Sequence, residues 1–488
     1  MKQNPSLALR AVLAVLLETG FYALSIGLAA LLAAVPVLEL LVAERLHLKL
    51  ALFCLVGAGT IVWSIFPRRD RFSAPGPEIS REEAPGLHAL VDELAAATGQ
   101  PAPERIYLVP DANAWVARRG GFMGIGARPL MGIGIPFVAG LGAGELRAVL
   151  AHEFGHFVGG DVRLGPRIWR TRSAIERSVE SLGKRSGLLQ APFLAYGRLY
   201  LRITQAVSRA QEFAADALSA RLAGPAAAAG ALRSTTRISA AHELYWGNEL
   251  GPVLSRGFAP PLAEGFRRYL EAPAIAPALA AAEARELESD ATGAYDSHPS
   301  TRARLDAIAA LGLPAPAGGE DGPAASLVPG LPALEAALLA RLAGEGRKFE
   351  PLAWESTGEA VWLAYWREWA KELPAPPAGT PLAEAARLAA DAALFPAEAE
   401  PTREGETPAE AARSRKVSSL GFNLALALRA AGWTAATGPG EQLRLVSGDK
   451  AFDPFEAAAA LASGELGDEA WRGRCAALGF AEVPFTAA

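Results

Sequence analysis

The sequence predicts a mainly helical α+β protein with a small β-sheet, made of an N-terminal transmembrane helical hairpin, a central domain and a separate C-terminal α/β region. Two long uncharged runs near the N-terminus, helical periodicity over most of the remaining chain and a few short strand-like segments support this fold class. The 488 residues also exceed what one hydrophobic core usually spans. We therefore expect a hairpin over residues 1–72, a central domain over 73–311, a Pro/Gly-rich linker over 312–330 and a C-terminal region over 331–488.

The hairpin is predicted from two uncharged runs. The first has twenty residues from Thr19 to Leu38, and the second has eighteen from Leu50 to Pro67. Both are long enough to cross the hydrocarbon core of a bilayer. The alternative is a cleaved signal peptide with Lys2 and Arg10 as its basic flank, but the first run is longer than the apolar core of a typical signal peptide.

Basic residues flank the hairpin unequally, and this sets its expected orientation. The turn carries two basic residues, Arg45 and Lys49. The two ends that face the other side carry five: Lys2, Arg10, Arg68, Arg69 and Arg71. The positive-inside rule then places everything after residue 68 in the cytoplasm, in a multi-pass protein of the cell (inner) membrane whose partner is the lipid bilayer.

Composition excludes two other classes of protein. The two cysteines, Cys54 and Cys475, do not imply a disulfide framework, which fits a reducing compartment. A formal net charge of −5 offers no broad basic surface for nucleic acid, so no nucleic-acid partner is expected. The arginines just after the hairpin are better explained as an anchor beside the membrane.

The start of the central domain alternates helix and strand patterns. Residues 85–100 have apolar side chains at helical spacing and reach a glycine at position 99, which indicates an amphipathic helix. Residues 105–110 are aliphatic and aromatic and end at a proline, as a strand does. Residues 129–144 are uncharged but short and glycine-rich, so we expect strand and turn there rather than a third membrane span.

A further helix is predicted over the segment "ELRAVLAHEFGHFVGG", residues 145–160. Gly159 and Gly160 are expected to end it. Its apolar side carries Leu146, Val149, Leu150, Phe154 and Phe157. Residues 162–222 have the pattern of two long helices, with an apolar patch over 188–196 that we expect to touch the membrane surface without crossing it.

The rest of the chain is helical with one strand signal. Residues 217–310 are alanine-rich and mostly helical. In the C-terminal region "QLRLVSG", residues 442–448, alternates like a strand between helix-like runs at 417–431 and 454–464. We identify no catalytic motif in the C-terminal region.

The pattern His-Glu-x-x-His occurs on the helix at 145–160. His152 and His156 are four residues apart, so both imidazoles lie on one helix face and can bind one ion. Zinc takes nitrogen ligands at this spacing, and Glu153 lies close enough to take a proton from water activated at the metal. Because the chain has six histidines, chance is the alternative, and a third ligand is required to exclude it.

Two layouts could supply the third ligand. A histidine six residues after His156 is excluded, because Val162 occupies that position. A glutamate on a later helix is available in "SRAQEFAAD", where Glu212 is followed one turn later by Asp216. Asp216 could accept the second ring N–H of a ligating histidine and fix its tautomer.

Four segments together resemble a known family. "DANAW" (111–115), "ELRAVLAHEFGH" (145–156), "SRAQEFAAD" (208–216) and "SHPSTRARL" (297–305) are similar, in this order, to the HtpX and type I CAAX prenyl protease-like family of membrane zinc metallopeptidases. The resemblance implies a gluzincin-type peptidase domain with one Zn²⁺ per chain and protein or peptide substrates. It further implies a membrane-anchored endopeptidase that serves protein quality control at the cytoplasmic membrane.

The same resemblance implies roles for individual residues. His152, His156 and Glu212 would bind zinc, Glu153 would be the general base and Asp216 would support a ligating histidine.

Residues outside the zinc set also receive roles from the resemblance. Asn113, Ala114 and Trp115 would lie at the edge strand that pairs with an extended substrate. His298 would stabilise the oxyanion, with a cap or loop histidine as its alternative, and Arg304 is expected to be a structural ion-pair partner.

Departures from the family leave alternatives open. Family members of the HtpX type have further membrane spans between the histidines and the third ligand, whereas this interval carries arginines, so we do not expect a membrane-enclosed chamber. One alternative is a membrane-anchored interaction or chaperone-like protein with a structural zinc site, although such sites usually include cysteine. Another is a latent peptidase, inhibited by residues 131–144 or by the C-terminal region.

Overall fold

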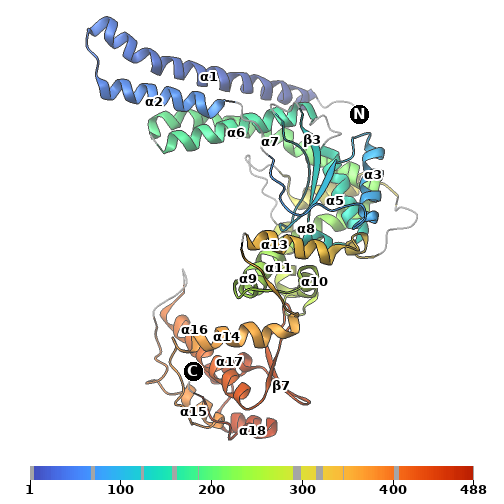
Figure 1. Cartoon of the computed structure of the whole chain (residues 1–488), viewed down its shortest axis with the longest axis vertical. Coiled ribbons are helices and arrows are strands. Elements are labelled where there is room, and N and C mark those ends of the chain that lie inside the picture. Colours follow the sequence, from blue (N-terminus) through green and yellow to red (C-terminus); the bar gives the residue numbers. More distant parts are fainter. Residues whose placement is uncertain are drawn as a thin grey trace. The chain divides into compact units, whose positions relative to one another are not determined.

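The computed structural model is mainly helical with small sheets, as the sequence predicts (Figure 1). The chain divides into two compact units, residues 1–240 with 279–338, and residues 241–278 with 339–488. The boundaries expected at residues 72, 312 and 330 stay predictions. The structure describes residues 5–66, 72–121, 126–156, 162–184, 186–288, 298–314, 322–344, 346–399 and 406–486.

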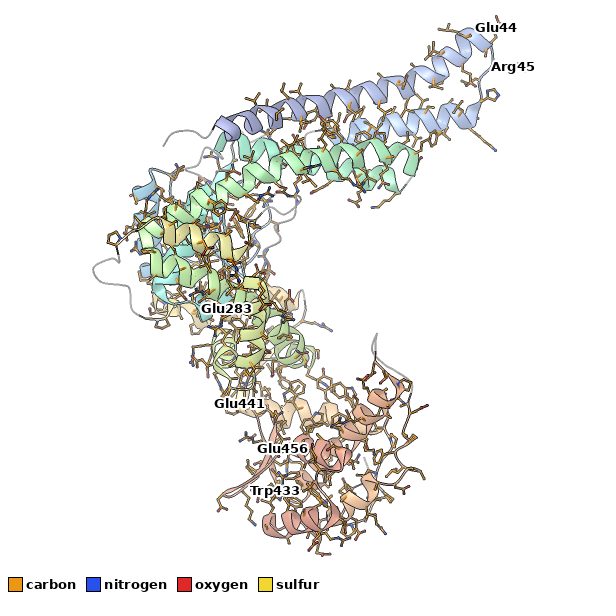
Figure 2. All side chains as sticks on the ribbon, turned by 180° about the vertical axis from the view of Figure 1, so that it is seen from behind. Glu44, Arg45, Glu283, Trp433, Glu441 and Glu456 are labelled. Carbon is orange, nitrogen blue, oxygen red and sulfur yellow. The ribbon has the colours of Figure 1, made fainter. Side chains whose placement is uncertain are left out.

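The first unit begins with a helical hairpin that contains both uncharged runs. Helices α1 (Pro5–Ala43) and α2 (Leu48–Ile65) are each long and apolar enough to cross a membrane. Glu44 and Arg45 lie at the tip between them (Figure 2). Large apolar side chains near the tip are exposed, among them Leu41, Val42, Leu48 and Leu52. Such a surface is typical of lipid contact.

A second helical hairpin packs on the first. Helices α6 (Val162–Gly183) and α7 (Gly187–Ala223) are the two long helices that the sequence predicts. They lie beside α1 and α2 (Figure 1). Their shared core includes Phe21, Ile61, Ile175, Leu189 and Phe193. The apolar patch predicted over residues 188–196 is therefore divided, because helical periodicity turns Leu189 and Phe193 inward while Leu188 stays exposed.

Buried polar contacts join the two hairpins. The hydroxyl oxygens of Ser64 and Ser178 lie 2.7 Å apart, and both side chains are buried. The hydroxyl of Tyr196 donates to the carbonyl oxygen of Leu17 at 2.6 Å. Because an unpaired polar group costs free energy in an apolar layer, these contacts favour one register of α6 and α7 along the first hairpin.

The first unit also contains a three-stranded sheet. Strands β1 (Arg105–Val109), β2 (Ala114–Arg119) and β3 (Arg128–Gly134) occur in the order β1-β3-β2, with β3 parallel to β1 and antiparallel to β2. Strand β2 therefore lies at an edge of the sheet, and no strand among the described residues pairs with its other side. The strand predicted from residue 129 is confirmed, and a one-turn helix, α4 (Ile135–Gly140), follows it where the sequence predicts a turn.

Helix α5 (Ala143–His156) is the helix predicted over residues 145–160, and it packs closely against α7. A Cβ atom added to Gly155 would lie 2.7 Å from the Cα atom of Ala215. The hydroxyl of Ser219 on α7 donates to the carbonyl oxygen of Ala148 at 2.7 Å. Gly155 thus allows the backbones of α5 and α7 to approach without a side chain between them. The helix end predicted at residues 157–160 lies outside the described residues.

Other helices cover α5 and complete the first unit. Helix α3 (Pro85–Thr98) confirms the amphipathic helix predicted at 85–100 and packs on α5 through its buried face. The remaining elements that lie wholly or largely in the first unit are α8 (Pro225–Tyr245), α11 (Ala276–Glu288), α12 (Thr301–Ala310), η3 (Ala324–Leu327) and α13 (Leu331–Ala343). The hydroxyl of Ser300 accepts from the N–H of Ala303 and so caps α12.

The second unit has its own core. Its sheet has the order β6-β7-β8, and β7 confirms the strand predicted within residues 442–448. Its core combines leucines and alanines with aromatic side chains, among them Trp366, Phe452, Trp471 and Phe480. Its elements are η2 (Trp246–Leu250), α9 (Gly251–Ser255), β4 (Phe258–Ala259), α10 (Leu262–Glu271), β5 (Glu350–Pro351), η4 (Trp354–Ser356), η5 (Gly358–Trp362), α14 (Leu363–Ala370), η6 (Leu382–Glu384), α15 (Ala385–Ala389), α16 (Pro408–Ala430), β6 (Thr434–Ala436), β7 (Arg444–Ser447), β8 (Lys450–Phe452), α17 (Pro454–Ser463) and α18 (Asp468–Leu478).

The contact between α5 and α7 predicts the effect of a single methyl group. We expect Gly155→Ala to force the two helices apart and to lower the free energy of unfolding by about 1–3 kcal/mol, the usual cost of overpacking. Thermal unfolding of the full chain in detergent measures this change. Gly473→Ala on α18 is the control, since its added methyl group meets no atom within 4 Å. Equal unfolding temperatures for the two variants would contradict the close packing.

Candidate metal centre

Helix α5 presents the two histidines on one face. His152 and His156 are one turn apart, and their Nε2 atoms lie 3.2 Å from each other. Potential ligand atoms of His152, Glu153 and His156 all lie within 4.8 Å of one another. Within the described ranges, this is the one group of three such side chains placed to hold a metal ion.

Helix α7 adds a carboxylate to the pair. The Oε2 atom of Glu212 is 3.5 Å from Nε2 of His152, and its Oε1 atom is 3.8 Å from Nε2 of His156. Ligand atoms 2.0–2.1 Å from a tetrahedral zinc ion are about 3.4 Å apart. The three measured separations therefore fit a single zinc ion.

The burial of Glu212 supports the same fit. The residue is 5% exposed, and its Oε2 atom makes no hydrogen bond of normal geometry, with Nε2 of His152 and Nη2 of Arg304 each 3.5 Å away. A buried carboxylate oxygen with only such long contacts is costly. A cation held with His152 and His156 would remove that cost.

Asp216 and Arg304 fix the orientation of His152. Oδ1 of Asp216 lies 3.0 Å from Nδ1 of His152. Arg304 on α12 donates to both oxygens of Asp216, from Nε at 2.8 Å and from Nη2 at 2.7 Å. This paired geometry is the strongest form of an arginine–carboxylate contact. With Nδ1 of His152 held by Asp216, Nε2 of the same ring is directed at Glu212. The contact between Arg304 and Asp216 also agrees with the structural ion-pair role expected for Arg304.

His298 also lies at the cluster. Its Nδ1 atom is 3.0 Å from Oε1 of Glu212, and its side chain is 66% exposed. The residue immediately precedes the buried Pro299 and the cap of α12. An exposed imidazole that contacts the cluster from one side is available to a molecule that enters from solvent.

The three residues predicted at the edge strand have different positions. Asn113 precedes β2, and its carbonyl oxygen accepts from the N–H of Gly134 at 2.7 Å. Asn113 and Ala114 line a cavity together with His152 and Glu153. The ring of Trp115 packs over Gly132 instead and is not part of that cavity, because side chains alternate along a strand.

Electrostatics differ among the ionisable groups of the cluster. Burial alone would lower the pKa of His152, but hydrogen bonds to Asp216 and Glu212 outweigh it and raise this pKa to about 9. Burial would raise the pKa of Glu212, yet hydrogen bonds from His152 and His298 bring it well below its usual range. For Glu153 burial prevails over the nearby histidines and raises the pKa. A carboxyl group shifted toward neutral pH is suited to carry a proton.

Helix α8 contributes residues that the sequence analysis does not single out. Ala228, Ala231, Leu232 and Thr235 line the cavity beside His152 and Glu153. These residues are spaced by three and four positions and so share one helix face, and this spacing is the feature of the sequence that could identify them. An alanine-rich segment without a motif does not indicate which partner that face has.

Comparison with known proteins identifies similar sequences. Residues 81–311 match the model of Peptidase family M48. A "Protease HtpX homolog" of Sulfurihydrogenibium sp. is 32% identical over 33% of this chain and 59% of its own length. One of Persephonella marina is 32% identical over 38% of this chain and 65% of its own length. This chain thus spans less than two thirds of either relative. No solved structure matches it significantly.

The geometry predicts that Arg304 matters for metal affinity. We expect Arg304→Gln to weaken zinc binding by about 10- to 100-fold, because Asp216 would no longer be held against His152. Competition with a chromophoric chelator measures the affinity. The control is Arg302→Gln on the same helix, whose guanidinium donates to the carbonyl oxygen of Leu287 away from the cluster. Equal zinc affinity in the two variants would contradict the positioning role.

Proposed function

We propose, from the premise that residues 81–311 belong to peptidase family M48, that this chain is a membrane-anchored zinc-dependent metalloendopeptidase. The observation that carries the proposal is the convergence of His152, His156 and Glu212 at separations that fit one zinc ion, with Glu153 beside them. Metallopeptidases need a metal site of this donor type with a nearby base. One zinc ion per chain follows from the single such cluster among the residues that the structure describes.

The residues of the chain divide the reaction between them. When bound, zinc supplies the Lewis acidity that polarises a peptide carbonyl and makes water acidic enough to be deprotonated near neutral pH. Glu153 takes the proton from the attacking water and later gives it to the leaving amine, a transfer that its raised pKa favours. Asp216 and Arg304 hold His152 in one tautomer throughout.

Two further groups act on the substrate in this proposal. The outer edge of β2, with which no described strand pairs, binds an extended segment of the substrate by strand addition, next to Asn113 and Ala114. His298, exposed and in contact with Glu212, donates to the oxygen that gains negative charge as the carbonyl carbon becomes tetrahedral. Trp115, whose ring packs over Gly132, contributes to substrate binding at the same edge strand from outside the cavity.

The proposed substrates are unfolded or damaged proteins close to the membrane. Strand addition recognises backbone groups and requires an extended chain, which a folded protein does not offer. The hairpin α1–α2 would cross the inner membrane twice and hold the peptidase domain at the cytoplasmic face, as the basic residues after the hairpin favour. Such an enzyme would act in protein quality control.

The role of Glu153 gives the direct test of activity. We expect the zinc-loaded full chain in detergent to hydrolyse casein, and Glu153→Gln to lose about 10²- to 10⁴-fold in rate while it keeps one zinc ion. The control is Glu176→Gln, which removes an exposed carboxylate on α6. If the parent chain holds one zinc ion and cleaves neither casein nor shorter peptides, the peptidase proposal is wrong and a structural zinc site is favoured.

The orientation has a separate test. We expect proteinase K added outside intact spheroplasts to leave the region after residue 72 undigested, because it lies in the cytoplasm. Digestion after lysis shows that the same region is accessible when the membrane is open. Cleavage in intact spheroplasts would place the peptidase domain on the other side of the membrane.

A further inference from the structure

The second hairpin, α6–α7, lies beside α2 over about half of the length of α2 (Figure 1). The contact between Ser64 and Ser178 lies at the end of α2 away from the tip. Leu189, just after the turn between α6 and α7, packs near the middle of α2, since a Cβ atom added to Gly57 would lie 3.0 Å from its Cδ1 atom. The 18 residues of α2 are about 27 Å long, so nearly the whole helix is needed to cross the hydrocarbon core. When α1–α2 crosses the membrane, the turn of α6–α7 therefore lies inside that core.

Three of the four helices present apolar side chains to the outside at this depth. The exposed side chains include Ile26 and Leu31 on α1, Trp63 on α2, and Leu188 and Leu194 on α7. Lipid tails can contact these faces without loss of hydrogen bonds.

Polar side chains that point into the bundle at this depth are satisfied within the chain. The amide of Gln190 donates from Nε2 to the carbonyl oxygen of Val179 at 3.0 Å. Ser64 and Ser178 bond to each other, and both are fully buried. These groups therefore need no partner from outside the bundle.

The outer face of α6 differs from the other three helices because it carries an ion pair. Nζ of Lys184 lies 2.7 Å from Oε1 of Glu180, and the two side chains are 73% and 69% exposed. Both residues follow Ser178 in the direction of the turn, so they lie level with the half of α2 between Ser64 and Gly57. Charged side chains at such a depth are costly in lipid and are normally covered by protein or water. No described segment of this chain covers the pair.

A second ion pair on α6 has a different surrounding. Arg172 and Glu176 lie on the other side of Ser178, with Nε of the arginine 3.0 Å from Oε1 of the glutamate. That position is level with the end of α2 or beyond it, where lipid headgroups and water solvate an exposed charge. The pair at Arg172 and Glu176 therefore needs no cover and provides an internal control.

We propose that the face of α6 around Glu180 and Lys184 binds the same face of a second copy of this chain in the membrane. A two-fold axis along the membrane normal places Glu180 of each copy beside Lys184 of the other, so the pair is complementary to itself. A second copy also presents this pair at the same depth, because the same hairpin sets that depth. Ser181 and Gly183 are small and allow the two helices to approach closely. The inference rests on the proposed membrane crossing and not on peptidase activity.

Disulfide cross-linking of the full chain in native membranes tests this contact. Ser181→Cys places a thiol beside the ion pair and keeps both charges, in a chain whose two buried native cysteines are replaced by alanine. We expect oxidation to yield a disulfide-linked dimer. The control is Ala191→Cys, at an exposed position of α7 that is a similar distance from the hairpin turn, and it should stay monomeric. A monomeric Ser181→Cys chain, or equal cross-linking through Ala191→Cys, would overturn the proposal.

Reversal of charge tests the complementarity. Glu180→Lys brings four positive charges together in the dimer and should reduce the cross-linked fraction of the Ser181→Cys chain at least about tenfold. Lys184→Glu should have the same effect, and the two changes together should restore cross-linking because opposite charges meet again. The control is Glu176→Lys, the same change of charge one helix turn nearer the headgroups, which should leave cross-linking unchanged. Equal loss in Glu176→Lys, or no recovery in the double variant, would reject the proposed contact.

Labelling of the hairpin tip separates failure of the dimer from failure of the membrane crossing. Arg45→Cys at the tip (Figure 2) should react with a membrane-impermeant maleimide added outside intact spheroplasts. If the tip reacts and Ser181→Cys stays monomeric, the crossing is supported and the dimer is rejected. If the tip reacts only after lysis, the crossing is wrong and the argument for the dimer fails with it. Hydrolysis of casein enters neither result, so the peptidase proposal is tested independently.

Discussion

The close contact between α5 and α7 is the constraint on which the candidate metal centre depends. Each helix carries one pair of polar residues a turn apart, His152 and His156 on α5 and Glu212 and Asp216 on α7. The pairs meet because Gly155 lets the backbones approach. A separation larger by the width of a methyl group would move the carboxylate out of range of an ion held by both imidazoles.

Charge makes the same region costly to bury unless a cation is present. Glu153, Glu212 and Asp216 are three carboxyl groups around one guanidinium, that of Arg304. Two negative charges would remain if the three acids were ionised and the histidines neutral. A divalent cation balances them and would be the largest local charge in the site. Without the cation, burying these carboxylates would cost free energy that Arg304 alone does not offset. The residues therefore suit a metal site better than a purely structural ion-pair network.

The sequence predicts the parts of this structure that depend on local spacing. The two histidines are predictable because four residues make one helix turn, and the strand at 105–109 and the helix at 85–98 follow from short periodic patterns. Glu212 is predicted as a candidate from the layout in which a later helix supplies a glutamate, and the motif resemblance supports it, since a separation of many residues does not by itself define a contact. The packing of α6 and α7 on the first hairpin includes the contact of Ser64 with Ser178, and local periodicity carries no information on such a contact. The cavity wall on α8 was missed for the same reason, because alanines mark a buried face without naming its partner.

The coordination of zinc by two histidines and one glutamate is the central claim. X-ray absorption at the zinc edge, recorded on the purified full chain, measures it most directly. The account predicts nitrogen and oxygen neighbours alone at about 2.0–2.1 Å, with the scattering pattern of two imidazoles, and loss of most of the bound zinc in Glu212→Gln. A sulfur neighbour at about 2.3 Å, or zinc retained without the two imidazoles, would contradict it.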